Sequence, residues 1–380
     1  MIYNTFHDLR ISALGMGTMR LPVINGKEGM VDEKAAEEIL DYCYKKGVNY
    51  FDTAWGYHDE TSELVVGRIL EKYPRESFYL ANKFPGYDLA NMPKVKEIFT
   101  KQLEKCRVEY FDFYMYHNLC EINVEEYLDP KYGIHAYLLA QKAAGRIRHL
   151  GFSAHGNLNT MKRFLEAVGT DMEFCQIELN YFDWSFQHAK QKVELLNEWN
   201  IPILVMEPVR GGQLATLDES AAGRLKALRP EEKIPAWAFR FLQGIPNLVT
   251  TLSGMSAMQQ AIDNIATYEE SRPLSDSELC VLLEIADEMI ARTAVPCTAC
   301  HYCTSHCPKE LDIPELMQLY NEVKASGSGV FIGPMGLAAM GQDKQPSACI
   351  GCRSCEQVCP QQIKISEVLA AFAASMEQAG

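Results

Sequence analysis

The sequence has no apolar run long enough to cross a membrane and no excess of positive charge. A membrane span needs roughly 18–20 apolar residues, whereas the apolar stretches here contain charges, such as Arg240 within 237–242. The 36 Lys and Arg residues face 50 Asp and Glu residues, and the resulting net charge of −14 disfavours polyanionic partners. Residues 1–10 lack a basic and then apolar leader pattern and contain Asp8. We therefore expect a cytoplasmic protein that binds neither nucleic acid nor membrane.

A disulfide framework is also missing from the pattern, although the chain has 13 cysteines. Such frameworks belong mostly to small secreted domains, whereas 380 residues with 47% apolar content suffice for one large domain and a smaller one. Eight cysteines lie within 297–359, in two tight groups. The other five are scattered singly, and we expect them to be small buried apolar residues: Cys43, Cys106, Cys120, Cys175 and Cys280. The clustering of the eight predicts metal sites.

Both cysteine groups have the spacing Cys-x2-Cys-x2-Cys-x3-Cys-Pro. In two-cluster ferredoxins with this spacing, three thiolates bind one cubane cluster and the fourth binds the other cluster. We therefore predict two [4Fe-4S] clusters. Zinc sites also accept four cysteines, but they rarely carry two copies of this spacing. The ligands expected for the first cluster are Cys297, Cys300, Cys303 and Cys359. Those expected for the second cluster are Cys349, Cys352, Cys355 and Cys307.

Residues 1–275 alternate short apolar strands with amphipathic helices. One helix, for example, has Asp32 positioned as its N-cap and Gly47 as its end. Eight strands are expected, at 14–18, 48–53, 78–83, 111–116, 150–153, 174–179, 203–206 and 248–252. Such alternation requires a parallel sheet, and eight units favour a (β/α)8 TIM barrel. A doubly wound sheet is the alternative, but the GxGxxG turn that usually follows its first strand is not present after Gly15 and Gly17.

A second, smaller domain is expected at 276–380. It begins with a helix around 276–291, for which Ser275 and Glu278 fit a capping box. The long interval between Cys307 and Cys349 contains a helix-like segment at 314–323. We therefore predict a mostly helical, ferredoxin-like domain rather than the compact βαβ form.

Polar residues follow several of the predicted barrel strands at their carboxyl ends, where TIM barrels place their active sites. These residues are Asp52, Tyr57 just beyond it, Lys83 and His117. A tyrosine hydroxyl has a pKa near 10, so it exchanges protons at neutral pH only with help. A lysine cation beside it stabilises the phenolate, an aspartate pairs with the lysine, and a histidine can orient a carbonyl oxygen. Any one of these residues alone is more often structural, but four at successive strand ends favour catalysis.

The motifs around these residues resemble those of the aldo/keto reductases over about residues 1–270. They are Gly15-Met16-Gly17-Thr18-Met19, Asn49-Tyr50-Phe51-Asp52-Thr53-Ala54-x-x-Tyr57, Asn82-Lys83, Asp112-x-Tyr114-x-x-His117 and Gly145-Arg146-Ile147-Arg148-x-x-Gly151-x-Ser153. With its tail, the chain resembles aldo/keto reductases that carry a ferredoxin-like 4Fe-4S domain. The resemblance implies hydride transfer between a nicotinamide and a carbonyl, with Tyr57 as general acid and base, Lys83 and Asp52 tuning it, and His117 positioning the substrate.

The resemblance also implies a nucleotide site, which matches less completely. The matched positions are Gly17, Thr18, Met19, Ser153, Gln176, Met206, Pro208, Val209, Gly211, Ser253, Ser256, Gln260 and Asn264. Ala154 stands where the family usually has Asn, and Met206 replaces the aromatic that stacks on the nicotinamide. Gly254 and Gln260 occupy the positions of the basic pair that holds the 2′-phosphate, and a phosphate favours Lys or Arg. NADP and NAD therefore both stay open as cofactors.

Five aromatic residues are expected in loops around the barrel mouth, where they form either a substrate pocket or local packing: Trp55, Tyr87, Tyr181, Phe182 and Trp184. The expected function is an oxidoreductase that acts on a small-molecule carbonyl or alcohol. Its two clusters relay electrons, and a redox partner protein is a further expected partner. Nicotinamides transfer electron pairs whereas each cluster transfers one electron, so direct exchange between them is awkward. A flavin in the barrel or a radical on the substrate could split the pair, or the clusters could only stabilise the tail, and all three alternatives stay open. The alternative function is an electron-transfer or docking protein whose barrel does not transfer hydride.

Overall fold

The computed structural model describes residues 1–27, 29–293, 295–297, 303–326, 332–359 and 361–377. The chain divides into two compact units, Met1–Leu283 and Glu284–Gly380. The border lies within α12 (Asp276–Thr293), whereas the sequence analysis places the domain border just before this helix. Among the described residues, no helix combines the length and the apolar character that crossing a bilayer requires.

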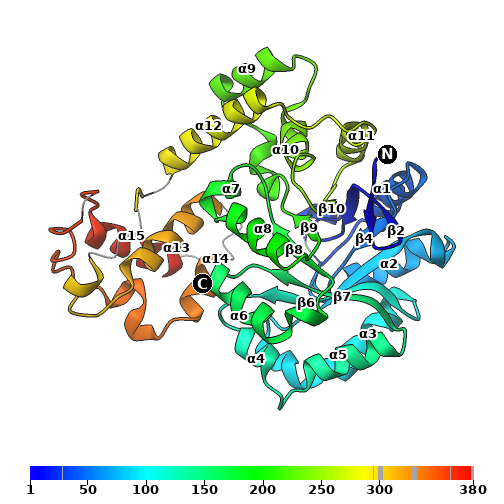
Figure 1. The fold of residues 1–380 in the computed structure, drawn as a ribbon, viewed down its shortest axis with the longest axis horizontal. Helices are drawn as coiled ribbons and strands as arrows, with labels where there is room; N and C mark the ends of the chain where they lie inside the picture. Colours follow the sequence, from blue (N-terminus) through cyan, green and yellow to red (C-terminus); the bar gives the residue numbers. More distant parts are fainter. Residues whose placement is uncertain (28, 294, 298–302, 327–331, 360, 378–380) are drawn as a thin grey trace. The chain divides into compact units, whose positions relative to one another are not determined.

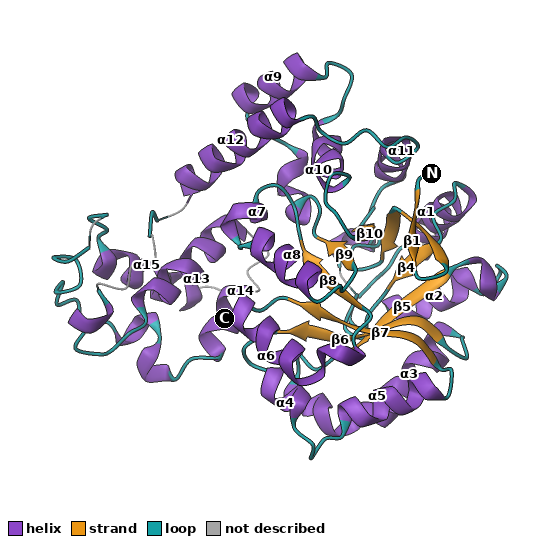
Figure 2. Ribbon diagram, viewed as in Figure 1, coloured by secondary structure: helices purple, strands orange, loops and turns teal. Residues whose placement is uncertain are grey.

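Eight parallel strands close into a barrel in the first unit (Figure 1 and Figure 2). Around the barrel the order is β10, β3, β4, β5, β6, β7, β8 and β9. Each strand therefore pairs with the strands before and after it in the sequence, and the barrel closes where the last strand, β10, pairs with β3. Their bounds are β3 (Leu14–Gly17), β4 (Tyr50–Asp52), β5 (Tyr79–Phe84), β6 (Phe111–Leu119), β7 (Ile147–Ala154), β8 (Phe174–Glu178), β9 (Ile203–Met206) and β10 (Leu248–Ser253). The predicted (β/α)8 barrel is confirmed, and each expected strand overlaps one of these.

Helices surround the barrel, as the alternating pattern predicts (Figure 2). In α1 the Asp32 carboxylate accepts a hydrogen bond from Ala35 N at 3.1 Å, and Gly47 follows with φ +93°, a value that favours glycine. The barrel helices are α1 (Glu33–Lys45), α2 (Ser62–Leu70), α3 (Val95–Cys106), α4 (Val124–Leu128), α5 (Ile134–Ala143), α6 (Leu158–Val168), α7 (Asp183–Phe186), α8 (Ala189–Glu198), α9 (Glu219–Leu228), α10 (Ile234–Leu242) and α11 (Met258–Thr267). Short 3-10 helices are η1 (Ile24–Gly26), η2 (Arg75–Ser77), η3 (Leu89–Lys94), η4 (Gly169–Asp171) and η5 (Arg210–Ala215).

A β-hairpin that the sequence analysis does not predict closes the end of the barrel at which the strands begin. Strands β1 (Tyr3–Phe6) and β2 (Leu9–Ser12) pair antiparallel. Asn4 Nδ2 donates to the carbonyls of Leu248 and Val249, at the start of β10, at 3.2 and 2.9 Å. Phe6 is buried against Phe113, with ring centroids 5.2 Å apart. The hairpin therefore seals the base of the barrel core with an aromatic side chain.

The second unit is helical, as predicted. After the second half of α12 it contains α13 (Ile313–Ser326), α14 (Ile332–Ala338) and α15 (Ile365–Glu377), with the 3-10 helices η6 (Thr304–His306), η7 (Gln342–Lys344) and η8 (Pro346–Ala348). Leu316, Leu369 and Phe372 are fully buried in its core.

The capping box before α12 is present, because Ser275 N donates to Glu278 Oε2 at 2.8 Å and Glu278 N to Ser275 Oγ at 3.4 Å.

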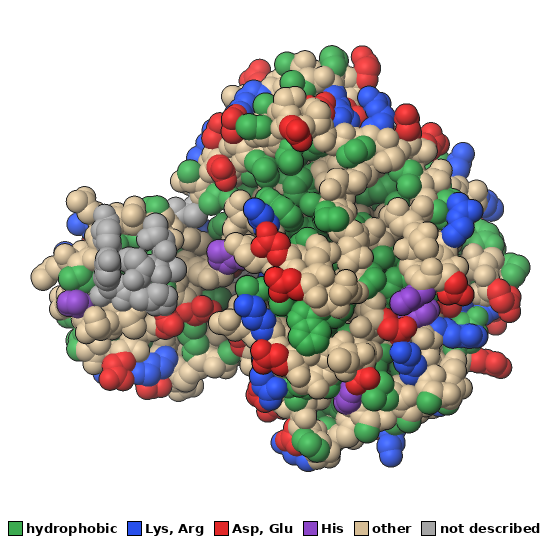
Figure 3. Space-filling view, in the orientation of Figure 1, with side chains coloured by type: hydrophobic (Ala, Val, Ile, Leu, Met, Phe, Trp, Pro, Cys, Tyr) green, Lys and Arg blue, Asp and Glu red, His purple; other side chains and the backbone are tan. Residues whose placement is uncertain are grey.

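Charged side chains of both signs are interspersed over the face of the barrel unit that Figure 3 shows. Several form exposed ion pairs, such as Arg163 Nε with Glu125 Oε1 at 2.8 Å. Pairs of this kind contribute little to stability, because water screens them and two long side chains lose freedom. The Lys83–Asp52 pair at the barrel mouth is buried, so water screens it less than these surface pairs.

Candidate active site and cluster site

Three of the predicted catalytic residues lie on adjacent barrel strands. Asp52 is the last residue of β4, Lys83 lies near the end of β5, and His117 lies near the end of β6. These strands pair in parallel register, with Asp52 opposite Ala81 and Lys83 opposite Met115. Their carboxyl ends therefore meet at one mouth of the barrel.

The Lys83 ammonium joins the predicted catalytic residues to one another. Its Nζ lies 2.5 Å from Asp52 Oδ1 and 2.9 Å from the Thr53 carbonyl. It also donates to Tyr57 Oη at 3.4 Å, which brings the loop after β4 over the strand ends. The Tyr57 and His117 rings approach edge to face, with centroids 6.0 Å apart. The structure thus brings together all four residues that the sequence analysis selects.

Burial controls the charges of this group. It raises the pKa of the Asp52 carboxyl and lowers the pKa of the Lys83 ammonium, while their mutual contact opposes both shifts. Burial, together with the negative charges of Asp52 and Glu207, also raises the pKa of Tyr57 well above its ordinary value. The pKa of His117 lies well below its ordinary value because of burial and the nearby Lys83 cation. At neutral pH the site therefore holds a protonated tyrosine and a neutral imidazole.

A buried polar network behind Lys83 was not anticipated from the sequence. Asn82 Nδ2 donates to Glu63 Oε1 at 2.8 Å, and Asn82 Oδ1 accepts from Lys83 N at 2.8 Å. Gln102 Nε2 donates to the Lys83 carbonyl at 2.9 Å, and Lys105 Nζ donates to Glu63 Oε2 at 3.1 Å. These bonds hold the backbone of Lys83 from two helices, α2 and α3. Glu63 and Gln102 lie in amphipathic helices and follow no motif, so only the tertiary structure reveals them.

Residues predicted to bind the nicotinamide lie beside the same mouth. Ser153, the penultimate residue of β7, is paired in register with Gln176 of β8, and Ser153 Oγ accepts from Asn118 N at 2.9 Å. Gln176 Nε2 contacts Met206 Sδ at 3.6 Å. The buried Gln176 Oε1 has no hydrogen-bond partner within the described residues. A buried acceptor of this kind requires a donor, and a carboxamide NH2 supplies one. Ser153, Gln176 and Met206 therefore fit a nicotinamide.

The remaining residues predicted to bind the nucleotide follow strands β3, β9 and β10. Gly17 ends β3, and Thr18 Oγ1 donates to the Asp52 carbonyl at 2.9 Å, while Met19 beyond it is exposed. Ser253 ends β10, and its Oγ accepts from Asn264 Nδ2 of α11 at 3.1 Å. Pro208 and Val209 precede η5, in which Gly211 has φ +64°. The Gln260 carboxamide oxygen accepts from Ser256 N and Ala257 N at 2.8 and 3.1 Å, so this side chain caps α11.

An ion pair that the sequence does not signal connects these loops. Arg20 Nη2, after β3, lies 3.1 Å from Glu207 Oε1, after β9. The second Glu207 oxygen accepts from Gly211 N, and Ser256 Oγ donates to the Arg20 carbonyl at 2.6 Å. Arg20 and Glu207 are more than a quarter exposed, so solvent and ligands reach the pair. The three loops thus form one connected rim.

The predicted aromatic residues divide into two groups. Tyr87 is 38% exposed and its ring meets the His117 ring edge to face, at 5.1 Å between centroids. Trp55 packs under the Lys105 ammonium, which lies 4.0 Å from the centre of its ring. Tyr181 and Phe182 are buried, and the half-buried Trp184 packs edge to face on Phe241 with ring centroids 5.5 Å apart, which favours the packing interpretation for these three. Only Tyr87 thus combines exposure with contact to a residue of the candidate site.

Seven of the eight clustered cysteines lie within the described residues, and six of these seven lie in or against the core of the second unit. Cys303 and Cys355 are buried in that core, and Cys297, Cys307, Cys349 and Cys359 pack against it. Cys352 is exposed. Cys300, predicted as a ligand of the first cluster, lies outside the described residues.

A cavity that is open to solvent lies in the second unit. Its lining includes the four cysteines predicted to bind the second cluster: Cys307, Cys349, Cys352 and Cys355. Cys307 belongs to the first motif and the other three to the second. Leu311 N donates to Cys307 Sγ at 3.5 Å, and hydrogen bonds to ligand sulfurs are a feature of iron–sulfur sites. Three cysteines of one motif and the fourth cysteine of the other thus line one site, and this donor set fits a [4Fe-4S] cluster.

Comparison with known families gives two matches. The model of the Aldo/keto reductase family matches residues 13–285, and that of the 4Fe-4S dicluster domain matches residues 296–363. The first match covers the barrel and its mouth. The second includes all eight clustered cysteines, because both motifs, from Cys297 to Cys359, fall inside it. Neither match supports a flavin in the barrel.

Individual relatives agree with these matches. The NADH-specific methylglyoxal reductase of Escherichia coli is 23% identical over 325 residues, which cover 74% of this chain and 97% of the relative. Among solved structures, the aldo-keto reductase AKR11C1 from Bacillus halodurans superposes with a TM-score of 0.62 at 23% identity, over 75% of this chain and 96% of that one. An aldo/keto reductase from Klebsiella pneumoniae in complex with NADP and acetate gives 0.60 at 18% identity, over 74% and 93%. The chain therefore belongs to the aldo/keto reductase family of NAD(P)-dependent oxidoreductases, and a 4Fe-4S dicluster domain follows its reductase domain.

Proposed function

We propose that the barrel interconverts a small carbonyl compound and its alcohol, with Tyr57 as the general acid and base. The observation that carries this proposal is the position of Lys83 Nζ, 2.5 Å from Asp52 and 3.4 Å from Tyr57 Oη. A bound nicotinamide supplies the hydride to the carbonyl carbon. Tyr57 Oη gives its proton to the carbonyl oxygen, and the Lys83 cation stabilises the phenolate that results. Alcohol oxidation reverses both transfers.

His117 has a narrower role in this proposal. Because its pKa is well below the ordinary value, its imidazole is neutral and donates a hydrogen bond from one ring nitrogen. A neutral donor polarises and orients the carbonyl oxygen without competing with Tyr57 as the acid. Tyr87, whose ring meets that of His117, is the residue we propose to contact the substituents of the substrate.

We also propose that the preferred cofactor is NADH. The side chains at the start of α11, Ser256 and Gln260, are uncharged, and Gln260 is engaged in capping the helix. A 2′-phosphate gains most from Arg or Lys, so neither of these two side chains gives NADPH a charge-assisted bond. The name of the Escherichia coli relative specifies NADH, although NADP and NADPH occupy solved relatives. Michaelis constants for both nucleotides test the proposal, which fails if NADPH has the lower value. Gln260→Arg should lower the Michaelis constant for NADPH selectively.

The catalytic proposal is tested with Tyr57→Phe. Reduction of a panel of small aldehydes and ketones, including methylglyoxal, should fall about 10²–10⁴-fold, with NADH binding and the cluster absorbance unchanged. Tyr44→Phe is the matched control, because it removes a hydroxyl whose partner is Ser77 on the outer surface of the barrel unit. Unchanged carbonyl reduction in Tyr57→Phe would contradict the proposal and favour a docking or electron-transfer protein whose barrel does not catalyse hydride transfer.

For the second unit, we propose that it carries electrons to or from a redox partner. Each bound [4Fe-4S] cluster supplies one-electron transfer. The described lining of the second cluster site includes the exposed Cys352, and Ile350 beside it is 60% exposed, so this site lies near the surface of its unit. Visible spectra of the anaerobic protein before and after NADH addition test the link to the barrel. Bleaching of the cluster absorbance would show that the barrel feeds the clusters, and absence of bleaching with intact carbonyl reduction would contradict that link.

A further inference from the structure

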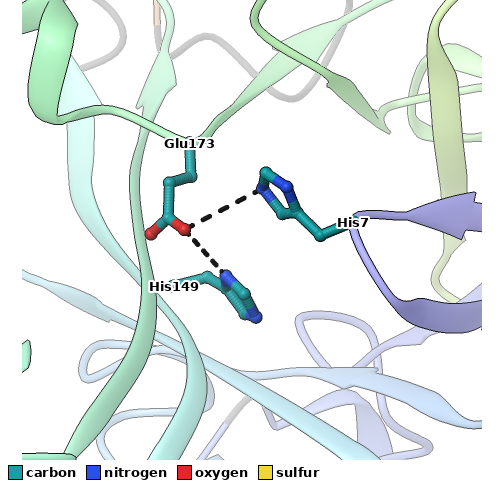
Figure 4. Close-up of side chains that lie close together, drawn as sticks. All are labelled: His7, His149 and Glu173. Atoms are coloured by element: carbon teal, nitrogen blue, oxygen red, sulfur yellow. Dashed lines mark hydrogen bonds and ion pairs between the residues drawn. The ribbon is translucent and has the colours of Figure 1, made fainter.

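A second group of chemically active side chains lies at the base of the barrel, away from the mouth. His7 is in the turn between β1 and β2, His149 is the third residue of β7, and Glu173 directly precedes β8 (Figure 4). Phe113, opposite His149 in the register of β6 and β7, belongs to the core that the hairpin seals. The proposed reaction at the mouth of the barrel uses none of these three residues.

Two imidazoles face one carboxylate oxygen in this group. His149 Nδ1 lies 3.0 Å from Glu173 Oε2, and His7 Nε2 lies 3.9 Å from the same oxygen (Figure 4). All three atoms lie within 4.8 Å of one another. Two histidine nitrogens and a carboxylate oxygen form a donor set that suits Zn²⁺ and the neighbouring divalent transition metals. The three residues therefore supply three of the ligands that such an ion needs.

The surrounding contacts orient this carboxylate as a ligand. Glu173 Oε1 accepts from Lys142 Nζ at 2.7 Å and from Leu150 N at 3.1 Å, which leaves Oε2 for the histidines. Hydrogen bonds of this kind hold the first ligands of a metal site in position. The His149 ring packs edge to face on Phe6, with centroids 5.0 Å apart, so its orientation is fixed as well.

The rings of His7 and His149 lie parallel, with 11° between their planes and 5.6 Å between centroids. One divalent ion uses both rings in their neutral form and offsets the charge of the carboxylate.

We propose that His7, His149 and Glu173 bind one divalent transition-metal ion, represented by Zn²⁺, which ties the hairpin to the barrel base. Zinc–nitrogen bonds are about 2.0–2.1 Å long, so His7 must move toward the other two ligands. Its place in an exposed turn allows this, because the side chain is 51% exposed. The proposal is independent of the chemistry proposed for Tyr57.

Titration of the cluster-loaded protein with ZnCl2 under anaerobic conditions tests the proposal. Wild type should bind one zinc equivalent more tightly than His7→Ala does, with a dissociation constant at least about tenfold lower. Zinc bound by cysteines is common to both proteins, so the difference isolates the histidine site. His135→Ala is the matched control, because His135 also pairs with a carboxylate, Asp171, at 3.1 Å, but no second imidazole of the described residues joins them in a ligand group.

Thermal unfolding gives a second readout. Zinc should raise the midpoint of wild type and of His135→Ala, because an ion that binds only the folded state stabilises it. It should leave the midpoint of His7→Ala unchanged. Equal zinc stoichiometry and affinity in wild type and His7→Ala would overturn the proposal. An equal loss of affinity in His135→Ala would overturn it too, because any surface histidine would then serve.

Discussion

Replacing Lys83 separates the structural role of its charge from its role in catalysis. The side chain is 0% exposed, and Nζ lies 2.5 Å from Asp52 Oδ1. Lys83→Met leaves the Asp52 carboxyl buried without its cation, and removal of one partner of a buried pair costs about 3–5 kcal/mol. The double variant Asp52→Asn with Lys83→Met removes both charges. It should therefore recover most of the lost stability, since no unpaired charge stays buried.

Activity should not follow stability in this pair of variants. Both lose the ammonium that donates to Tyr57 Oη at 3.4 Å. We expect kcat for carbonyl reduction to fall about 10²–10⁴-fold in both, which corresponds to about 3–5 kcal/mol of barrier. Without the cation the pKa of Tyr57 rises further, so the alkaline limb of the kcat profile should move to higher pH. Urea unfolding followed by circular dichroism and anaerobic steady-state kinetics measure the two effects separately.

One result would refute this reasoning directly. If the double variant regained kcat to within tenfold of wild type, the Lys83 charge would serve folding alone. Equal destabilisation of the single and double variants would instead show that packing of the lysine stem, rather than its charge, holds the site.

Three further predictions concern other parts of the chain. Glu278, whose pKa the Arg229 guanidinium lowers to about 2 from 4.5, stabilises the fold by at most about 3 kcal/mol. Because the folded pKa is depressed, this contribution is present above pH 4.5 and is lost as pH falls toward 2. The difference in unfolding free energy between wild type and Glu278→Gln, measured by urea unfolding, should therefore shrink from pH 7 to pH 3. Gly67→Ala places a Cβ 2.5 Å from the Lys105 carbonyl of α3 and should lower the unfolding free energy by about 1–3 kcal/mol, whereas Gly223→Ala in α9, where nothing lies within 4 Å, should not destabilise the fold. Cys307→Ala should reduce bound iron from about eight to about four atoms per chain while the first cluster stays, and an unchanged iron content would contradict the assigned ligand set.

The features that the sequence predicts well depend on short-range patterns. The N-cap of α1 at Asp32 and the capping box of Ser275 and Glu278 are local hydrogen bonds between residues three apart, and both are present. The alternation of strands and helices requires parallel pairing, and parallel pairing places Asp52 and Lys83 side by side. The order of the strands in the sequence was therefore enough to predict that these catalytic residues lie close together.

Features that depend on contacts between distant segments were not predictable in this way. Strands β1 and β2 are four residues each, too short for a clear alternation of polar and apolar residues. The hairpin is stable because Phe6 fits among core rings such as Phe113 and Phe174. The Glu63 carboxylate similarly follows no motif, and its contacts with Asn82 and Lys105 arise only when α2 packs on α3.

The case of His117 shows what the structure adds where the sequence already selects the residue. Its place after a buried strand predicts proximity to the substrate but says nothing about its charge. In the structure burial and the Lys83 cation both disfavour the imidazolium and hold the His117 pKa well below its ordinary value, so the ring is neutral at neutral pH. A neutral ring donates a hydrogen bond but does not act as a strong acid. Proton transfer to the carbonyl oxygen therefore falls to Tyr57, and a pH dependence of kcat near the ordinary histidine pKa of 6.5 would contradict this assignment.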